Sequence, residues 1–298
     1  LIVAKQAFTK EIGQECQEII DNMDFSRFYN KDLGQLALGY EVDKNKISPY
    51  HYGSFCTEPR VTSYIAIARE QIPEEHWFRI PRTLPKEWEW QQQVPSGKTK
   101  KVMEYSLFEG YYTHNDVKYV PSWGGSMFEF LMPALVLNER ELAPQGLGLN
   151  DKRAVELQIA YAREEAHYPV WGISPCAKPD KPTEYGEYGI KYLGGKGYED
   201  KGVIAPHATF LALEFAPEQA IANLKELLKF EGIYGQYGFY DSVDINTKEV
   251  GTKYLCLDQA MTLIALDNYL NNGAIRRRFH NEPMIRKFEY LLSDETFF

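Results

Sequence analysis

Apolar residues recur every three or four positions in much of the chain, which is the spacing of a helix that buries one face. The first such stretch runs from Phe8 to Met23. Two helix starts carry further signals, because Asn150-Asp151 can cap one helix and Pro217 suits the first turn of another. The pattern predicts helices over residues 8–23, 58–70, 126–137, 151–167, 207–215, 217–230, 258–271 and 275–292.

Short extended stretches with turn-forming residues lie between these segments. They are residues 36–47, 102–120 and 239–254, with turns expected at Asp43-Lys44-Asn45, His114-Asn115-Asp116 and Asn246-Thr247. We interpret them as hairpins inserted between helices. The proline-rich stretch from Cys176 to Tyr185 is interpreted as a long functional loop rather than a domain boundary. The chain is therefore expected to be mainly α, with residues 1–298 in a single domain.

Composition narrows the range of partners. The net charge of -9 and the isoelectric point near 5.3 argue against nucleic acid and anionic membranes, which both need concentrated positive charge. No apolar run approaches the roughly 20 residues of a membrane-spanning helix. The four widely spaced cysteines show no zinc-finger pattern. Aromatic residues make up 14% of the chain, and their flat faces suit sugar rings, although packing is the commoner role of any single one.

The segment from Ser122 to Pro133 carries the strongest candidate for chemistry. A glycine-rich turn leads into a helix that is apolar on nearly every side, and such a helix is normally buried. Glu129 lies within it. Burial disfavours the charged carboxylate and raises its pKa, which suits an acid that protonates a glycosidic oxygen. The alternative is a structural ion pair with Arg60 or Arg153, and the segment by itself does not choose between the two.

Glu58 is the second candidate. It follows Thr57, a suitable helix cap, and lies with Pro59 in the first turn of a predicted helix. The helix dipole stabilises a carboxylate there, so the plainer interpretation is helix stabilisation. Glu58 would then keep a low pKa, which suits a base, a water-holding group or an acceptor for a sugar hydroxyl.

Four further positions give weaker signals. Trp171 suits ring stacking, although a lone tryptophan more often lies in a core. His207 begins a predicted helix and is expected to stay neutral there. Asp258 is either a helix cap or a second acid in a cleft, and the glycines near Asp241 allow a ligand to approach the backbone. The chain contains no nucleotide fingerprint, GxSxG elbow, HExxH pair, phosphate loop or EF-hand pattern.

Taken in order, these segments resemble the glucoamylase-like family, whose relatives include endo-β-1,2-glucanases and the middle domain of cyclic β-1,2-glucan synthases. The resemblance rests on motifs spread over most of the chain: Glu58-Pro59-Arg60, Pro73 to Arg79, Ser122 to Pro133, Trp171 to Ser174, Ala205 to Ala208, Tyr237 to Asp241 and Leu257 to Gln259. Each motif is weak alone, but their shared order argues against chance.

The resemblance implies a toroid of paired α-helices around a sugar-binding cleft. It also implies hydrolysis of glucan linkages by two carboxylates, without a metal or an organic cofactor. Glu129 matches the family's general acid, whereas Glu58, Asp241 and Asp258 are candidates for the base. Inversion at the anomeric carbon is the expected outcome. Substrate contacts are expected from Trp123, Trp171, His207, Tyr240, Arg60 and Gln259.

The implied substrate is an oligosaccharide or polysaccharide, first of all a β-1,2-glucan or a related β-glucan. The resemblance favours a periplasmic or extracellular location, and the sequence does not indicate an oligomeric state. Alternatives to a hydrolase are a transglycosylase, a sugar-binding module without catalysis, and an unrelated helical interaction protein.

Two departures from the family pattern fall in the expected cleft. Gly53 stands where many relatives carry an acidic residue, and Pro175-Cys176 replaces the Glu-Ser of synthase-type relatives. A complete toroid also needs twelve helices, four more than the pattern predicts. Either further helices lie in regions such as residues 79–120, or the chain lacks an N-terminal portion of the domain.

Overall fold

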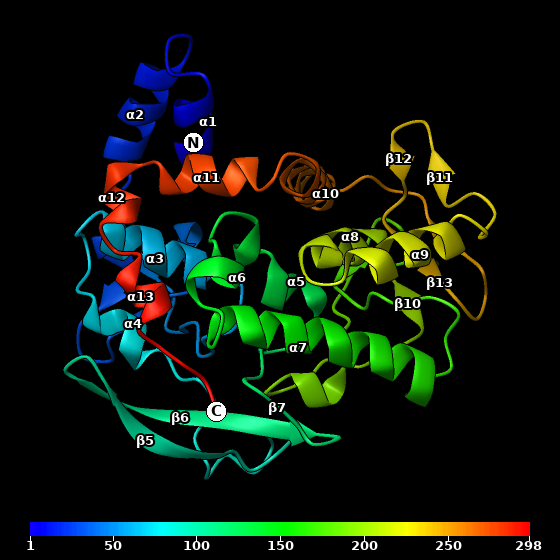
Figure 1. The fold of residues 1–298 in the computed structure, drawn as a ribbon, viewed down its shortest axis with the longest axis horizontal. Coiled ribbons are helices and arrows are strands. Elements are labelled where there is room, and N and C mark those ends of the chain that lie inside the picture. Colours follow the sequence, from blue (N-terminus) through cyan, green and yellow to red (C-terminus); the bar gives the residue numbers. More distant parts are fainter.

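The computed structural model describes residues 1–298, and helices form most of its regular structure (Figure 1). Short 3-10 or π turns extend several of these helices. The α-helices are α1 (Ile2–Ala7), α2 (Gly13–Asp21), α3 (Arg60–Ala68), α4 (Glu75–Arg79), α5 (Met127–Leu131), α6 (Glu139–Leu142), α7 (Leu147–Ala160), α8 (Pro206–Leu211), α9 (Pro217–Leu227), α10 (Cys256–Leu270), α11 (Ala274–His280), α12 (Pro283–Arg286) and α13 (Tyr290–Ser293).

The strands are mostly short and pair in small antiparallel sheets. Two sheets have three strands, and β6 and β13 are their central strands. These sheets contain β5 (Ser96–Val102), β6 (Tyr105–His114) and β7 (Val117–Tyr119), and β10 (Val203–Ile204), β13 (Ser242–Asp244) and β14 (Val250–Gly251). The two-stranded pairs are β1 (Tyr29–Asn30) with β2 (Gln35–Leu36), β3 (Tyr40–Glu41) with β4 (Lys46–Ile47), β8 (Cys176–Ala177) with β9 (Tyr185–Gly186), and β11 (Tyr234–Gly235) with β12 (Gly238–Phe239).

The elements gather around α7, which crosses the middle of the molecule (Figure 1). The β5–β6 hairpin lies along one edge. At the opposite edge α1 and α2 project from the body, and α1 contacts α11. The β11–β12 hairpin projects separately, beyond α8 and α9. The first and last helical segments thus lie together, although they are far apart in the sequence.

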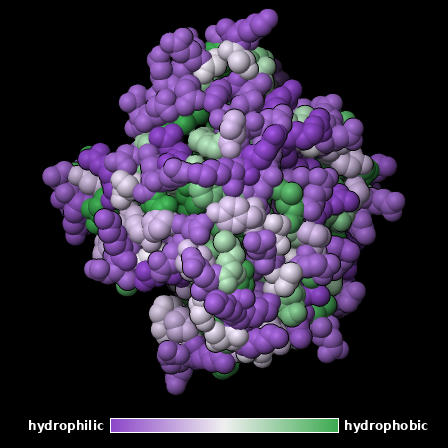
Figure 2. All heavy atoms as spheres, turned by 60° about the vertical axis from the view of Figure 1, so that its left-hand side comes forward, coloured by the Kyte–Doolittle hydropathy of each residue, from purple (hydrophilic) through white to green (hydrophobic).

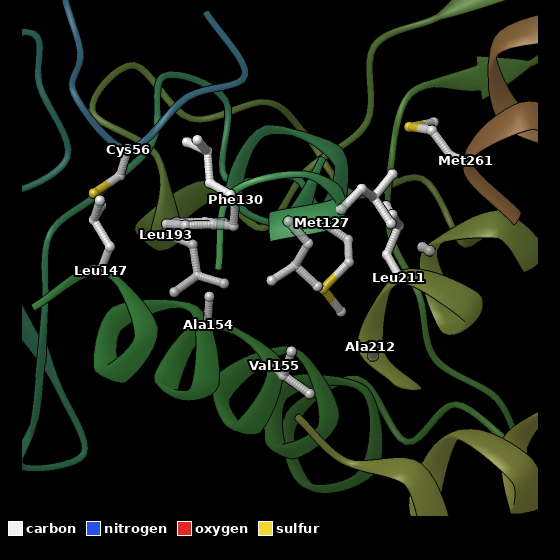
Figure 3. Packing of buried hydrophobic residues seen from close by; sticks show 14 of the residues in the cluster. Cys56, Met127, Phe130, Leu147, Ala154, Val155, Leu193, Leu211, Ala212 and Met261 are labelled. Atoms are coloured by element: carbon white, nitrogen blue, oxygen red, sulfur yellow. The ribbon is translucent and has the colours of Figure 1, made fainter. Parts of the chain in front are cut away.

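One apolar core of 58 buried residues extends from Ile2 to Phe297. At its centre α5 contacts both α7 and α8. Figure 3 shows Met127 and Phe130 of α5 packed above Ala154 and Val155 of α7. These four side chains are almost completely buried. Because protein interiors are closely packed, this contact with α7 fixes the position of α5.

Three predicted helices are present with bounds within three residues of the expected ones. They are α3, α9 and α10. All three predicted hairpins are also present, as β3–β4, β6–β7 and β13–β14. The mainly helical fold class is therefore confirmed. The stretch from Cys176 to Tyr185, expected as a loop, is closed at its ends by the short pair β8–β9.

Other predicted helices are broken. The expected helix over residues 8–23 is wrong, because residues 8–12 form a turn between α1 and α2 in which Phe8 and Ile12 are exposed. Pro133 ends α5 and begins a 3-10 turn, and Pro283 separates α11 from α12. Proline lacks the N–H that would continue the helix. Asn150 does not cap α7, which begins at Leu147, and its side chain bonds Val120 instead.

Regular structure that the pattern missed lies mainly between residues 75 and 142. This region contains α4, α6 and β5, and the pattern also missed α1 and the pairs β1–β2 and β11–β12. Figure 2 shows one face of the molecule, on which hydrophilic atoms predominate and hydrophobic atoms lie mostly in recesses between them. None of the helices has the length and apolar composition needed to cross a lipid bilayer.

Candidate active site

The candidate residues divide between two cavities and the protein core. A cavity of about 570 Å³ is lined by Glu58, Glu129 and Trp123 together with several aromatic side chains. A second cavity, of about 310 Å³, is lined by five further candidates, His207, Tyr240, Asp241, Asp258 and Gln259. We name them the glutamate pocket and the tyrosine pocket.

Glu129 accepts four hydrogen bonds at the start of α5. Its Oε2 accepts from the Ser122 hydroxyl (2.9 Å), the Ser126 hydroxyl (2.9 Å) and the Ser126 amide (3.0 Å), and its Oε1 accepts from the Gly124 amide (2.8 Å). Each hydroxyl also accepts a backbone N–H, from Gly125 and from Glu129 itself, so both hydroxyl protons are directed at the carboxylate. Burial raises the pKa of Glu129, and these donors oppose the rise.

The turn before α5 is held by backbone contacts that only glycine permits. Gly125 has a φ of 80°, and a Cβ there would lie 2.2 Å from the Ile190 carbonyl oxygen. A Cβ at Gly124 would lie 2.1 Å from the Tyr198 ring, and one at Gly189 would lie 2.2 Å from the Gly124 carbonyl oxygen. This close packing positions the amide and hydroxyl donors around Glu129.

Glu58 precedes α3 and faces the same pocket. No hydrogen bond from another side chain reaches its carboxyl group, which has only its own backbone N–H as a donor. Burial raises the pKa of Glu58 to about 7, and the negative charge of Glu129 adds to the rise. The sequence-based prediction of a low pKa is wrong, because desolvation outweighs the helix start and the positive charge of Arg60.

Arg60 is a structural residue, so its predicted role in substrate binding is wrong. It is 1% exposed. Its Nε lies 2.7 Å and its Nη2 lies 2.8 Å from the two carboxylate oxygens of Glu139, and Asp151 is 3.4 Å away. The ion-pair alternative for Glu129 is also wrong, since neither Arg60 nor Arg153 contacts its carboxylate.

The same guanidinium joins the two sides of the glutamate pocket. It donates to three backbone carbonyl oxygens, those of Thr57 (3.2 Å), Glu129 (3.3 Å) and Phe130 (2.6 Å). Thr57 directly precedes Glu58. Arg60 therefore ties the backbone beside one site carboxylate to the backbone of the other.

Tryptophans form one wall of the glutamate pocket. Trp123 and Trp88 line it, and Trp90 stacks with Trp88 and meets Trp123 edge-on, with ring centroids 5.4 and 5.9 Å apart. Trp88 and Trp90 are 42% and 51% exposed, which is unusual for side chains of this size. Sequence reasoning missed both, although two tryptophans in a polar stretch that follows a proline are a signal for an exposed aromatic surface.

Trp171 is not a stacking platform, so this prediction is wrong. Its side chain is 1% exposed and belongs to the apolar core. Its backbone amide donates to Asn223, whose own amide group donates back to the Trp171 carbonyl oxygen. The alternative weighed for a lone tryptophan, a core position, is the one observed.

The two departures from the family pattern affect different places. Gly53 lines the glutamate pocket, and a Cβ added there would meet no atom within 4 Å. The missing acidic side chain thus leaves the pocket wider. Pro175 is buried beside Ser174, whose hydroxyl contacts His207 in the tyrosine pocket.

The tyrosine pocket contains a buried group of two carboxyls and one imidazole. His207 Nδ1 lies 3.5 Å from Asp258 Oδ2, and one possible ligand atom from each of His207, Asp241 and Asp258 lies within 4.8 Å of the others. Burial and the charge of Asp241 raise the pKa of Asp258 to about 8. Burial lowers the pKa of His207 to about 3, so this residue is neutral as predicted, although burial is the cause.

Tyrosines line this pocket, among them the exposed Tyr237 and the half-buried Tyr240. Tyr240 stacks on Tyr254 with ring centroids 4.7 Å apart, and Tyr237 meets Tyr254 edge-on. Gln259 lines the pocket and donates weakly to the Phe239 carbonyl oxygen at 3.3 Å. The structure therefore brings Tyr240, Gln259 and His207 together in one cavity, whereas Glu129 lines the other.

The family model Glycoamylase, described as "Putative glucoamylase", matches residues 92–283. This match covers more than half of the chain. The chain therefore belongs to the glucoamylase-like family, and the resemblance drawn from the order of its motifs is confirmed.

Comparison with individual proteins gives relatives in β-1,2-glucan metabolism. The chain is 33% identical over 300 residues to the cyclic β-(1,2)-glucan synthase NdvB of Rhizobium meliloti, a match that covers 96% of this chain and 9% of the synthase. A solved β-1,2-glucanase from Parabacteroides distasonis superposes with a TM-score of 0.77 at 18% identity, over 99% of this chain and 43% of that one. An endo-β-1,2-glucanase from Chitinophaga pinensis superposes with a TM-score of 0.66 at 19% identity, over 98% and 68%. The chain thus spans a small part of the synthase and under half of the first glucanase, and both structures share its fold.

Proposed function

We propose that this chain cleaves glycosidic bonds of a β-1,2-glucan or a related β-glucan at the glutamate pocket. The observation that carries the proposal is that Glu58 and Glu129, 71 positions apart in the sequence, line one cavity beside Trp88 and Trp123. Two carboxyl groups flanking the bond are what most glycosidases use. Tryptophan faces suit sugar rings.

The environments of the two carboxyl groups favour different roles for them. Glu58, with a pKa of about 7, holds a proton near neutral pH and is the proton donor to the leaving oxygen. Burial raises the pKa of Glu129, but its four hydrogen-bond donors oppose that rise and favour its charged form. Glu129 is then the carboxylate that activates water. These roles are the reverse of those expected from the sequence, in which Glu129 was the acid and Glu58 a candidate base. Asp241 and Asp258 lie in the other pocket and are not needed for this step.

Hydrolysis with inversion is the leading form of the reaction. Inverting enzymes place their carboxyl groups about 6.5–9.5 Å apart to admit water, whereas retaining enzymes use about 5–5.5 Å. The substrate is an oligosaccharide or polysaccharide that enters the pocket between its tryptophans. We also infer that residues 1–298 form one domain, part of an α/α toroid, which is supported by the single core and by the fold shared with the glucanases.

Transglycosylation is a second candidate, favoured by the 33% identity with a cyclic glucan synthase. One carboxylate would then attack the anomeric carbon and form a covalent glycosyl-enzyme as the leaving oxygen takes a proton from the other carboxyl. A sugar hydroxyl instead of water would release the glycosyl group, and the two displacements together would retain the anomeric configuration. A binding module without catalysis is the third alternative, motivated by Gly53 in the pocket wall.

The test is to incubate the purified chain with linear β-1,2-glucan and to follow reducing ends and the product anomer by proton NMR. New reducing ends with inverted anomers support hydrolysis. Retained anomers with new linkages support transglycosylation. Glucan binding without either product, by the chain and by Glu58→Gln alike, would identify a binding module and reject the proposed chemistry.

A further inference from the structure

The tyrosine pocket contains three polar atoms that are buried without a protein partner. His207 Nδ1, Asp241 Oδ1 and Asp258 Oδ2 make no hydrogen bond. The three residues are only 2–3% exposed. Buried polar atoms normally have partners, so three unpartnered atoms in one place need a physical explanation.

The charges around these atoms are unbalanced. Two carboxyl groups face each other, and no lysine or arginine lines the pocket. Two buried carboxyls without a counter-charge cannot both stay ionised at low cost, so they either share a proton or bind a cation.

The surrounding hydrogen bonds orient the three side chains toward one point. His207 Nε2 contacts the Ser174 hydroxyl at 3.2 Å, which leaves Nδ1 as the free ring nitrogen. Asp241 Oδ2 accepts the Ala177 amide at 2.6 Å, which leaves Oδ1 free. Metal ligands are typically fixed in this way by a second bond on the opposite atom.

We propose that His207, Asp241 and Asp258 bind a divalent transition-metal ion of the zinc type, with one coordination position open to the tyrosine pocket. Zinc bonds of about 2.0–2.2 Å place neighbouring ligands of a tetrahedral ion about 3.3–3.6 Å apart. The 3.5 Å between His207 Nδ1 and Asp258 Oδ2 fits this spacing. Three protein ligands with a fourth position open to water or a sugar hydroxyl are typical of accessible zinc sites.

The ion would join three distant segments of the chain. His207 lies in α8, Asp258 lies in α10, and Asp241 directly precedes β13. This site lies outside the glutamate pocket and was not expected from the family resemblance, which implied no metal. Its role is to fix the floor of the tyrosine pocket, whatever reaction the glutamate pocket performs.

The test is calorimetric titration of the EDTA-treated, dialysed chain with ZnCl2, and separately with MgCl2 and CaCl2. One zinc ion per chain with a dissociation constant at or below the micromolar range is expected. Binding of magnesium and calcium should be at least tenfold weaker, because an imidazole nitrogen suits zinc better than either of them. Melting temperature should rise by several degrees with zinc.

Asp258→Asn is the main variant, because an amide of the same shape can donate to Asp241 and preserve the fold while removing one anionic ligand. It should weaken zinc binding at least a hundredfold. Asp241→Asn should do the same, so the test survives if one variant fails to fold. Glu58→Gln and Glu129→Gln should bind zinc normally, and Cys256→Ser controls for the exposed thiol near Asp258.

Cobalt provides an independent measurement on the unmodified chain. The intense visible bands of four-coordinate cobalt(II) should appear on titration and disappear when zinc is added. No zinc binding below millimolar concentration would overturn the proposal, as would binding that both Asp→Asn variants leave unchanged. In that case the two carboxyls share a proton, and Asp258→Asn should melt at the same or a higher temperature than the unmodified chain without any metal.

Discussion

The glutamate and tyrosine pockets each contain two acidic groups, but the two pairs are stabilised in opposite ways. Glu129 receives four hydrogen bonds from its own loop and helix. Asp241 and Asp258 face each other and a neutral His207, with an unpartnered atom on each. A carboxylate with donors already in place is ready to act as an anion. A pair without donors needs a proton or a cation before it is stable.

The largest expected effect is loss of activity in Glu129→Gln and Glu58→Gln. Each should lower kcat on β-1,2-glucan by about 10³-fold or more, because each removes a group that takes part in proton transfer. Initial rates of reducing-end formation measure this. Glu89→Gln, an exposed carboxylate on the tryptophan segment, is the matched control and should retain its rate. Normal turnover in Glu129→Gln would show that the hydrogen-bonded carboxylate of the glutamate pocket takes no part in the reaction.

Arg60→Met should cause a large loss of stability. It leaves Glu139 and Asp151 buried without their counter-charge, and breaking a buried ion pair in this way costs about 3–5 kcal/mol. Urea denaturation followed by circular dichroism gives the free energy of unfolding. Arg140→Met removes an exposed pair with Glu214 and should cost about 1 kcal/mol or less. Equal losses in the free energy of unfolding would show that the buried contacts of Arg60 stabilise the fold no more than an exposed ion pair does.

The pH dependence of stability tests the environment of Glu58. Its pKa in the folded chain, about 7, is above the ordinary value of 4.5, so the folded chain holds the proton more tightly than the unfolded chain. Stability from this group is therefore fully present below pH 4.5 and is lost as the pH rises to about 7. Glu58→Gln should remove this loss, which is about 3 kcal/mol at most. Parallel stability curves for the two proteins between pH 4 and pH 8 would reject the raised pKa.

The smallest expected effect on activity is that of Trp88, which lines the glutamate pocket. Trp88→Ala should raise KM about tenfold, equivalent to about 1.4 kcal/mol, with little change in stability because the side chain is 42% exposed. Trp171→Ala should instead lower stability by about 3–5 kcal/mol, since it empties part of the core. Steady-state kinetics and thermal melting separate the two results. A destabilised Trp88→Ala would argue against an exposed binding surface.

Much of the fold could be predicted from the sequence because helix periodicity is a local property. The helix breaks at Pro133 and Pro283 could also have been predicted from the sequence, since proline kinks or breaks a helix when it lies in the interior. The short helices α4 and α6 were missed because four or five residues carry too little periodicity. The sequence also contains the capping-box pattern Ser126-x-x-Glu129, which agrees with Ser126 as the N-cap of α5 and Glu129 as its third residue.

The site could be predicted residue by residue but not as an arrangement. Glu58 and Glu129 were both identified, yet nothing local places them in one pocket while Asp258 lies in another. Arg60 was assigned to substrate because its partner Glu139 lies 79 positions away. The pKa of Glu58 was predicted in the wrong direction, since its helix position is local but its burial depends on segments far along the chain.

The close packing of Gly124, Gly125 and Gly189 has a consequence for how the protein tolerates change. Any side chain at these positions would collide with backbone or with Tyr198, and the collision would displace the donors of Glu129. In a library that randomises residues 122–129 and 187–194, surviving variants should keep these three glycines while neighbouring positions vary. Library members that lack one of these glycines should also have lost the carboxylate site. The three glycines are therefore a more restrictive sequence marker of this pocket than the two glutamates.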